Sequence, residues 1–147
     1  LVIGGEAKAV TKASELALEK GARRAIPLNT SGPFHTKLLE AASVKLKERF
    51  ETVTFNEMKV PVIFNSTAKE LAEDTTVAKM LEKQVMSSVY FEDSIRYMIA
   101  NGVDTIIEIG PGKVLSGFVR KIDRKIKTYQ VEDQASLEKT LAGLKGE

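Results

Sequence analysis

The sequence has no cysteine, which excludes a disulfide framework and a thiolate zinc site. It has one histidine, so a histidine-based metal site would need a carboxylate cluster, and the sequence shows none. No apolar run approaches the roughly 18–20 residues that a membrane span needs, and no basic-then-apolar leader is visible. A net charge of +2 gives no bulk attraction to nucleic acid. We therefore expect a soluble, cytoplasmic protein with no metal, no membrane span and no nucleic-acid partner.

The composition that remains is typical of a globular protein. The chain has 147 residues, of which 43% are hydrophobic and 29% charged, and this suits one domain or two small pieces of one. It opens with "LVIGGEAKAV", an apolar, strand-like run without an initial methionine. We expect this chain to be the second part of a longer polypeptide.

Apolar periodicity predicts helices that alternate with strands. Residues with helical spacing lie at 6–20, 36–50, up to about 84, 91–101, 111–122 and 135–144. For the helix that ends near Gln84, Asp74 or Thr75 is the expected N-cap. Strand-like runs lie at 1–4, 24–30, 60–67, 103–110 and 126–131. This alternation predicts an α/β fold with a mainly parallel sheet.

Residues 1–31 form a small unit of their own in this pattern. A strand, a helix and a second strand follow one another, and Gly21 stands where a helix end favours a positive φ. Strand–helix–strand is half of a split βαββαβ, ferredoxin-like unit. We therefore expect residues 1–31 to be half of a small subdomain and 32–147 to belong to a separate core.

The single histidine, His35, follows the turn "SGPF" and precedes a helical pattern. Ligands of open α/β sheets bind beyond the carboxyl ends of strands, which makes His35 a candidate general base. The alternative is a surface histidine in a first helical turn. A base needs a nucleophile, but the sequence contains no G-x-S-x-G elbow, and neither Ser31 nor Ser66 has that spacing. The serine partner of His35 would then lie upstream of Leu1.

The segment "EIGPGKVLSGF", 108–118, invites comparison with a phosphate-binding loop. It fails the G-x-x-x-x-G-K-[ST] spacing, because only Pro111 separates Gly110 from Gly112 and Val114 replaces the hydroxyl residue. A tight strand-to-helix turn that could line a site is the favoured interpretation.

The segment "RKIDRKIK", 120–127, is strongly basic, with Lys or Arg at five of its eight positions. Such a run is typical of a solvated helix end, where cations oppose the helix dipole. The alternative is a landing patch for an acidic partner.

Several motifs, taken together, resemble a known family. In order, "GARRAIPLNTSGPFHTKLL", "VPVIFNSTA", "MLEKQVMSSVYFEDSIRYM" and "DTIIEIGPGKVLSGFVRKI" are similar to the C-terminal half of bacterial malonyl-CoA:acyl-carrier-protein transacylases. The resemblance covers nearly the whole chain. It implies the C-terminal part of an α/β-hydrolase-like core, with half of a ferredoxin-like subdomain, and an [acyl-carrier-protein] S-malonyltransferase of fatty acid biosynthesis.

The resemblance also implies roles for individual residues. His35 matches the histidine that takes a proton from the family's nucleophilic serine, and Gln84 matches the position whose backbone carbonyl orients it. Phe34 matches a residue that favours malonyl over methylmalonyl, because a ring would fill the space of a 2-methyl group. Asn65 and the 110–112 turn are expected near the substrate. Coenzyme A thioester and phosphopantetheinyl carrier are implied as substrates, and no separate cofactor is.

The same resemblance shows what this chain leaves to another segment. The serine elbow, the arginine that binds the malonyl carboxylate and the oxyanion loop all match positions upstream of Leu1, and neither Arg23 nor Arg24 matches that arginine. We expect the fragment alone to be inactive and to bind the N-terminal half of the enzyme. Malonyl-CoA and acyl carrier protein are the expected partners, the carrier through Arg120, Lys121, Arg124 and Lys125. Two alternatives stay open: an acyltransferase domain of a polyketide synthase and a non-catalytic α/β binding module.

Overall fold

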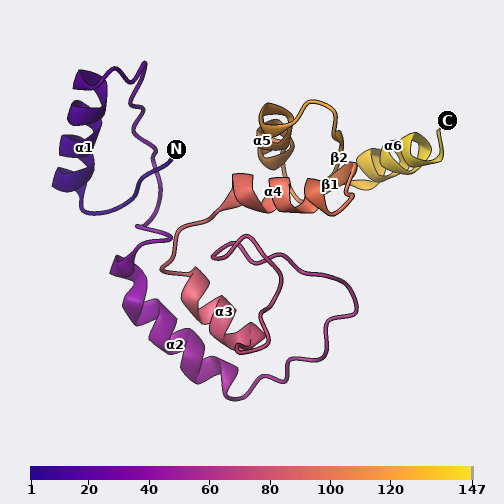
Figure 1. Ribbon diagram of the computed structural model, residues 1–147, viewed down its shortest axis with the longest axis horizontal. Coiled ribbons are helices and arrows are strands. Elements are labelled where there is room, and N and C mark those ends of the chain that lie inside the picture. The colour runs from indigo at the N-terminus through magenta and orange to yellow at the C-terminus, as the bar shows by residue number, and fades with distance from the viewer. Residues whose placement is uncertain (147) are drawn as a thin grey trace. The chain divides into compact units, whose positions relative to one another are not determined.

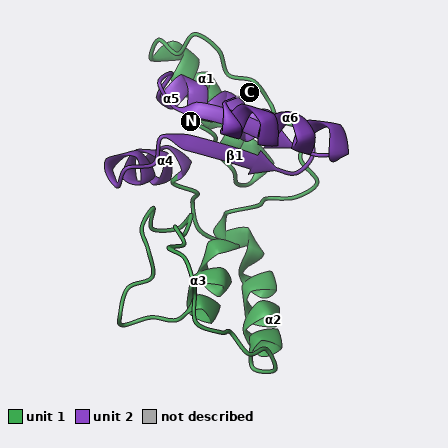
Figure 2. Cartoon of the chain, turned by 90° about the vertical axis from the view of Figure 1, so that its right-hand side faces the viewer, with its two compact units in different colours: residues 1–90 green, residues 91–147 purple. Residues whose placement is uncertain are grey.

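The structure is a computed structural model that describes residues 1–146 of the chain. These residues form two compact units, which divide between Tyr90 and Phe91 (Figure 2). The boundary predicted between residues 31 and 32 stays a prediction. Within residues 1–146, no helix combines the length and the apolar character needed to cross a lipid bilayer.

The first unit contains four short helical segments. They are α1 (Ala7–Glu19), the 3-10 helix η1 (Lys37–Leu39), α2 (Glu40–Phe50) and α3 (Val77–Gln84) (Figure 1). The helices predicted from periodicity at 6–20, at 36–50 and up to residue 84 are therefore confirmed. The N-cap of α3 is Thr76, whose side chain accepts a hydrogen bond from the backbone N–H of Lys79 at 3.3 Å, so the prediction of Asp74 or Thr75 was wrong.

Helices α2 and α3 lie side by side and contain the two most buried helical residues of the first unit (Figures 1 and 2). Those residues are Ser43 on α2, 3% exposed, and Met80 on α3, 6% exposed. A half-buried stripe along the same face as Ser43 contains Leu39, Ala42, Leu46 and Phe50. In contrast, α1 has no buried residue, although Gly21 ends it with the expected positive φ of 94°.

Three predicted strands, at 1–4, 24–30 and 60–67, are wrong for this structure. Within residues 1–146 these segments form no strand, and the last of them contributes one isolated bridge between Phe64 and Lys69. A strand exists only when its N–H and C=O groups pair with a neighbour. These segments have strand composition but no pairing partner in the described chain, so the strand–helix–strand unit of residues 1–31 shows its helix alone.

The second unit is a mixed α/β structure around a small parallel sheet. Its elements are α4 (Phe91–Ala100), β1 (Thr105–Ile109), α5 (Val114–Ile122), β2 (Lys127–Val131) and α6 (Gln134–Lys145) (Figure 1). The two strands pair in parallel, in a register that runs from Thr105 opposite Lys127 to Ile109 opposite Val131. A parallel pair needs a crossover connection, which α5 provides. The predicted α/β class with parallel strands is confirmed at this level.

The interior of the second unit is built from branched aliphatic side chains. Ile95 on α4, Val119 on α5 and Ile126 before β2 are 2%, 1% and 8% exposed and pack together. Phe91, Met98, Ile99, Ile106 and Ile122 surround them. Gly102, just after the end of α4, adopts a positive φ of 89°. This packing holds β1 and α5, and therefore the 110–113 turn between them, in a fixed relation.

Candidate active site

His35 lies in the turn that leads into η1 and α2. Its neighbour Thr36 is the N-cap of η1, because the Thr36 hydroxyl donates to the Pro33 carbonyl at 2.7 Å and accepts from the Leu38 N–H at 3.3 Å. These two hydrogen bonds fix Thr36 at the start of η1, so His35 lies just outside the helix. His35 is exposed in this chain.

The backbone of His35 is held in a conformation that side chains rarely adopt. Its φ is 60°, in the left-handed region, which few residues other than glycine occupy. This conformation costs energy and persists only where the surrounding structure imposes it. Two hydrogen bonds to the end of α3 do so. The backbone N–H donates to the Val85 carbonyl at 3.2 Å, and ring Nδ1 lies 3.1 Å from the Gln84 carbonyl oxygen.

The contact with Gln84 determines which ring nitrogen of His35 carries hydrogen. A backbone carbonyl can only accept, so Nδ1 must be the donor in this contact. In the neutral ring, Nε2 then carries the unshared electron pair. The ring is fixed in orientation by one nitrogen and can accept a proton at the other, which is the arrangement that a general base requires.

The end of α3 offers several carbonyl groups because a helix leaves its last carbonyls without intrahelical partners. The Lys83 carbonyl accepts from Met86 N–H and the Gln84 carbonyl from Ser87 N–H, both at 3.3 Å. The Gln84 oxygen therefore accepts two bonds, one from the following turn and one from the imidazole. This helix end carries partial negative charge, and it faces the ring that would become positive on taking a proton.

Phe34 and Asn65, the two predicted substrate-binding residues, lie in different turns. Phe34 precedes His35 and is 55% exposed, with its ring folded near Gly32. Asn65 is half-buried in the 64–67 turn, and its carbonyl accepts from the Tyr90 N–H at 2.8 Å. Among the described residues, the structure brings His35 and Gln84 into contact and records no hydrogen bond from Asn65 to either. The catalytic and substrate-binding roles of all four residues stay predictions.

The 110–113 turn of the second unit and the first turn of α5 donate hydrogen bonds to the chain's own carboxylates. The Glu132 carboxylate accepts from Gly112 N–H at 2.8 Å, and the Glu108 carboxylate accepts from the N–H groups of Leu115 and Ser116 at 3.1 and 2.8 Å. Hydrogen bonding holds the pKa of the Glu108 carboxyl below its ordinary value. The Ser116 side chain contributes most, followed by the N–H groups of Ser116 and Leu115. These donors would serve a phosphate in a phosphate-binding loop, so the structure agrees with the rejection of that interpretation.

The four basic residues predicted to meet a carrier protein lie at the end of α5 and in the turn that follows. Arg120 donates to the Thr128 hydroxyl at 2.8 Å, and the Lys121 ammonium lies 6.0 Å from the centre of the Phe118 ring. Arg124 and Lys125 are exposed. None of the four forms an ion pair within the part of the chain that the structure describes. Their role stays a prediction.

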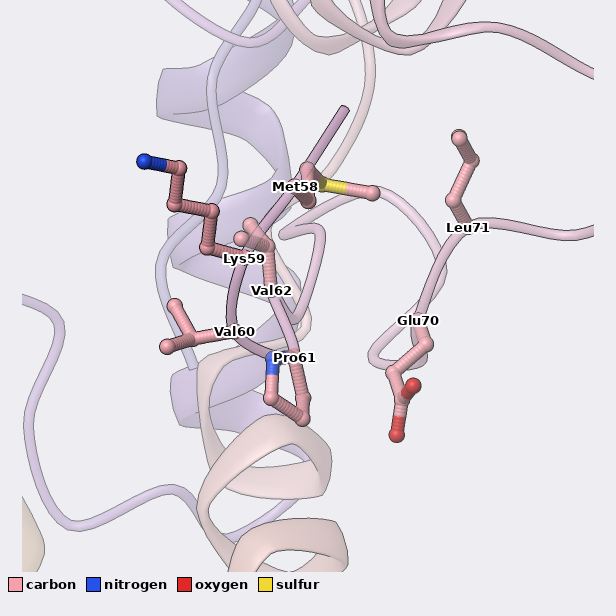
Figure 3. Close-up of a pocket in the computed structure, with 7 residues that line it drawn as sticks. All are labelled: Met58, Lys59, Val60, Pro61, Val62, Glu70 and Leu71. Carbon is pink, nitrogen blue, oxygen red and sulfur yellow. The ribbon is translucent and has the colours of Figure 1, made fainter. Parts of the chain in front are cut away.

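A separate pocket of about 320 Å³ lies in the first unit and is lined mainly by apolar residues. Its lining is Met58, Lys59, Val60, Pro61, Val62, Glu70 and Leu71 (Figure 3). The Lys59 ammonium and the Glu70 carboxylate lie on opposite sides of it and do not converge. The pocket follows the unpaired segment that the sequence predicted as a strand, where Val60 is 67% exposed.

Comparison with known proteins identifies relatives for the whole chain. No protein-family model matches it. Over 147 residues it is 49% identical to the malonyl CoA-acyl carrier protein transacylase of Bacillus subtilis (strain 168), and it covers 46% of that protein. The chain thus spans about half the length of the curated relatives it matches.

Solved structures agree with the sequence comparison. The malonyl CoA-acyl carrier protein transacylase from Clostridium perfringens ATCC 13124 superposes with a TM-score of 0.91 and 43% identity, over 97% of this chain and 45% of that one. A malonyl-transacylase in complex with a type II PKS acyl-carrier protein superposes with a TM-score of 0.86 and 31% identity, again over 97% and 45%. The relatives and solved structures that match this chain are thus malonyl CoA-acyl carrier protein transacylases, and the chain matches their C-terminal portion.

Proposed function

We propose that this chain supplies the general base of a malonyl transacylase that moves malonyl from coenzyme A to the phosphopantetheine thiol of acyl carrier protein in fatty acid biosynthesis. The observation that carries the proposal is the contact between His35 Nδ1 and the Gln84 carbonyl, 3.1 Å apart. It leaves Nε2 as the proton acceptor of a ring held in one orientation. The relatives' names support the reaction, and the geometry of His35 supports the part proposed for this chain.

In the first half-reaction, Nε2 of His35 takes the proton of a serine hydroxyl that comes from the N-terminal portion of the enzyme. The serine oxygen attacks the thioester carbonyl of malonyl-CoA, the bond between carbon and sulfur breaks, and the coenzyme A thiolate leaves. Nε2–H then protonates that thiolate. The Gln84 carbonyl accepts from Nδ1–H throughout, and the partial negative charge of the α3 end stabilises the imidazolium that forms between the two transfers.

In the second half-reaction the same nitrogen works in the opposite direction. Nε2 takes the proton of the phosphopantetheine thiol, whose sulfur attacks the malonyl-serine ester. The ester bond breaks, and the serine oxygen regains its proton from Nε2–H. The products are malonyl-carrier and free enzyme, so the exchange is of the ping-pong type.

We place Phe34 and Asn65 at the malonyl end of this site. The Phe34 ring would fill the space that a 2-methyl group needs, which biases the enzyme towards malonyl by about 1–3 kcal/mol, the usual value of one methyl in an apolar pocket. Asn65 would shape the same end. We further place the enzyme in the cytoplasm, together with the acyl carrier protein that it would load.

The finer description of the fold follows from the same proposal. Residues 1–31 would complete half of a ferredoxin-like subdomain and residues 32–147 the C-terminal part of an α/β-hydrolase-like core. The segments at 1–4, 24–30 and 60–67, which form no strand here, would then become strands by pairing with the N-terminal portion. Their high exposure here supports this, with Leu28 at 61% and Val60 at 67%.

The proposed function is tested with a hybrid enzyme, defined as the N-terminal portion of the Bacillus subtilis relative followed by this chain. We expect the hybrid to release coenzyme A from malonyl-CoA and to malonylate holo acyl carrier protein. We expect the 147-residue chain alone to do neither, because it has no serine elbow. A well-folded hybrid that formed no malonyl-serine would contradict the proposal, as would malonyl transfer by the chain alone.

The carrier surface gives an independent prediction. Charge reversal at Lys121 and Arg124 (K121E with R124E) is expected to raise the KM of the hybrid for acyl carrier protein by about tenfold, because it places repulsion where attraction would steer the carrier. The half-reaction with malonyl-CoA should not change. Reversal of Lys8 and Lys12 on α1 alters the net charge equally and serves as the matched control. Unchanged carrier kinetics in K121E with R124E, or an equal effect of the control, would contradict the assignment.

A further inference from the structure

Ser43 is a polar residue on the buried face of α2. Only 3% of its surface is exposed, and its hydroxyl donates to the Glu82 carbonyl oxygen of α3 at 3.0 Å. Its neighbours on the stripe, Ala42 and Leu46, are apolar. A buried hydroxyl is unfavourable unless it finds a partner, so an alanine would pack on this face more simply. The hydrogen bond to the Glu82 carbonyl explains why a serine occupies this buried position.

That acceptor lies in the part of α3 that holds His35. Glu82 is two residues before Gln84, in the last turn of the helix. Its carbonyl does not receive the following backbone N–H of Met86, which donates to Lys83 instead. The Ser43 hydroxyl therefore satisfies one of the carbonyls left open at the end of α3.

The end of α3 is consequently held at two points by one continuous segment. At the first point, His35 binds the carbonyls of Gln84 and Val85, and at the second point Ser43 binds the carbonyl of Glu82. A single attachment would let the helix end rotate about it. Two attachments fix its rotation, and with it the direction in which the Gln84 carbonyl points.

We propose that Ser43 is a positioning residue for His35, acting through the Glu82 carbonyl to fix the helix end that orients the imidazole. This inference rests on the proposed function of His35 as the general base. Ser43 is only 3% exposed and so offers almost no surface to a substrate. Its effect should therefore appear in the rate of proton transfer and not in the binding of malonyl-CoA.

The test uses the hybrid enzyme and the rate of malonyl-serine formation at saturating malonyl-CoA. Ser43→Ala is expected to lower this rate by about tenfold with KM unchanged, since small misplacements of a catalytic group cost up to about a hundredfold. Ser43→Thr keeps the hydroxyl and should restore most of the rate. Ser14→Ala is the matched control, because the Ser14 hydroxyl donates at 2.9 Å to the Val10 carbonyl within α1, and it should have no effect.

A double-mutant cycle separates positioning from general damage. In the His35→Ala background, Ser43→Ala should cause no further loss, because its effect passes through His35. A full additional tenfold loss there would overturn the inference, as would a wild-type rate for Ser43→Ala alone. Equal losses in Ser43→Ala and Ser43→Thr would overturn it too, because the hydroxyl would then be irrelevant. If His35→Ala itself were fully active, the proposed function would fail instead.

Discussion

Replacing His35 with alanine in the hybrid enzyme should slow malonyl transfer by about 10²–10⁴-fold, the usual contribution of a positioned general base. The loss should appear in both half-reactions, because the same nitrogen serves each of them. The KM for malonyl-CoA should change little, since the imidazole acts on protons and not on the bound acyl group. The measurements are the burst of coenzyme A release and the steady-state formation of malonyl-carrier.

Two control variants separate the loss of the His35 imidazole from a general effect of substitution near the site. Lys37→Ala changes an exposed residue two positions further along, in η1, and should leave the rate within about twofold, as expected for a surface change. Gln84→Ala removes a side chain but retains the backbone carbonyl that contacts Nδ1. It should keep most of the activity, whereas a catalytic role for the amide would abolish it. Near-normal activity of His35→Ala would leave the non-catalytic α/β binding module as the better description.

The elements that the sequence predicted correctly are those whose determinants lie within this chain. Helices are specified by local periodicity and end signals, so α2, α4 and the positive φ of Gly21 after α1 were predictable. β1 and β2 are consecutive strands, joined by one helix, that pair with each other in parallel. The strand at 60–67 was predicted from equally good composition, but composition cannot show that a pairing partner is present.

The site was predictable only in part, for a similar reason. His35 is 49 residues away from Gln84 in sequence, and no local pattern links a histidine to a distant backbone carbonyl. The family resemblance supplied that pairing, while periodicity supplied only the helices on either side of it. Ser43 and Glu108 were missed. The signal that could have indicated them is a polar residue within an otherwise apolar helix face or strand. In the structure, each of the two binds the end of a neighbouring helix.

The second large effect concerns stability and is measured on the 147-residue chain itself. Ile95→Ala should lower the free energy of unfolding of the second unit by about 2–5 kcal/mol, the usual range for truncating a buried isoleucine. Ile95 is 2% exposed and packs against Val119 and Ile126, so its loss opens a cavity between α4, α5 and the start of β2. The surrounding structure relaxes only partly around such a cavity, which is why the loss is large.

Ile109→Ala is the matched control, because it removes the same atoms from a side chain that is 82% exposed at the end of β1. It should change stability by less than about 0.5 kcal/mol in this chain. Amide hydrogen exchange in 105–109 and 127–131 reports opening of the second unit separately from the first. Faster exchange in both strands is expected for Ile95→Ala alone. Equal effects of the two variants would mean that the interior formed by Ile95, Val119 and Ile126 does not hold the second unit together.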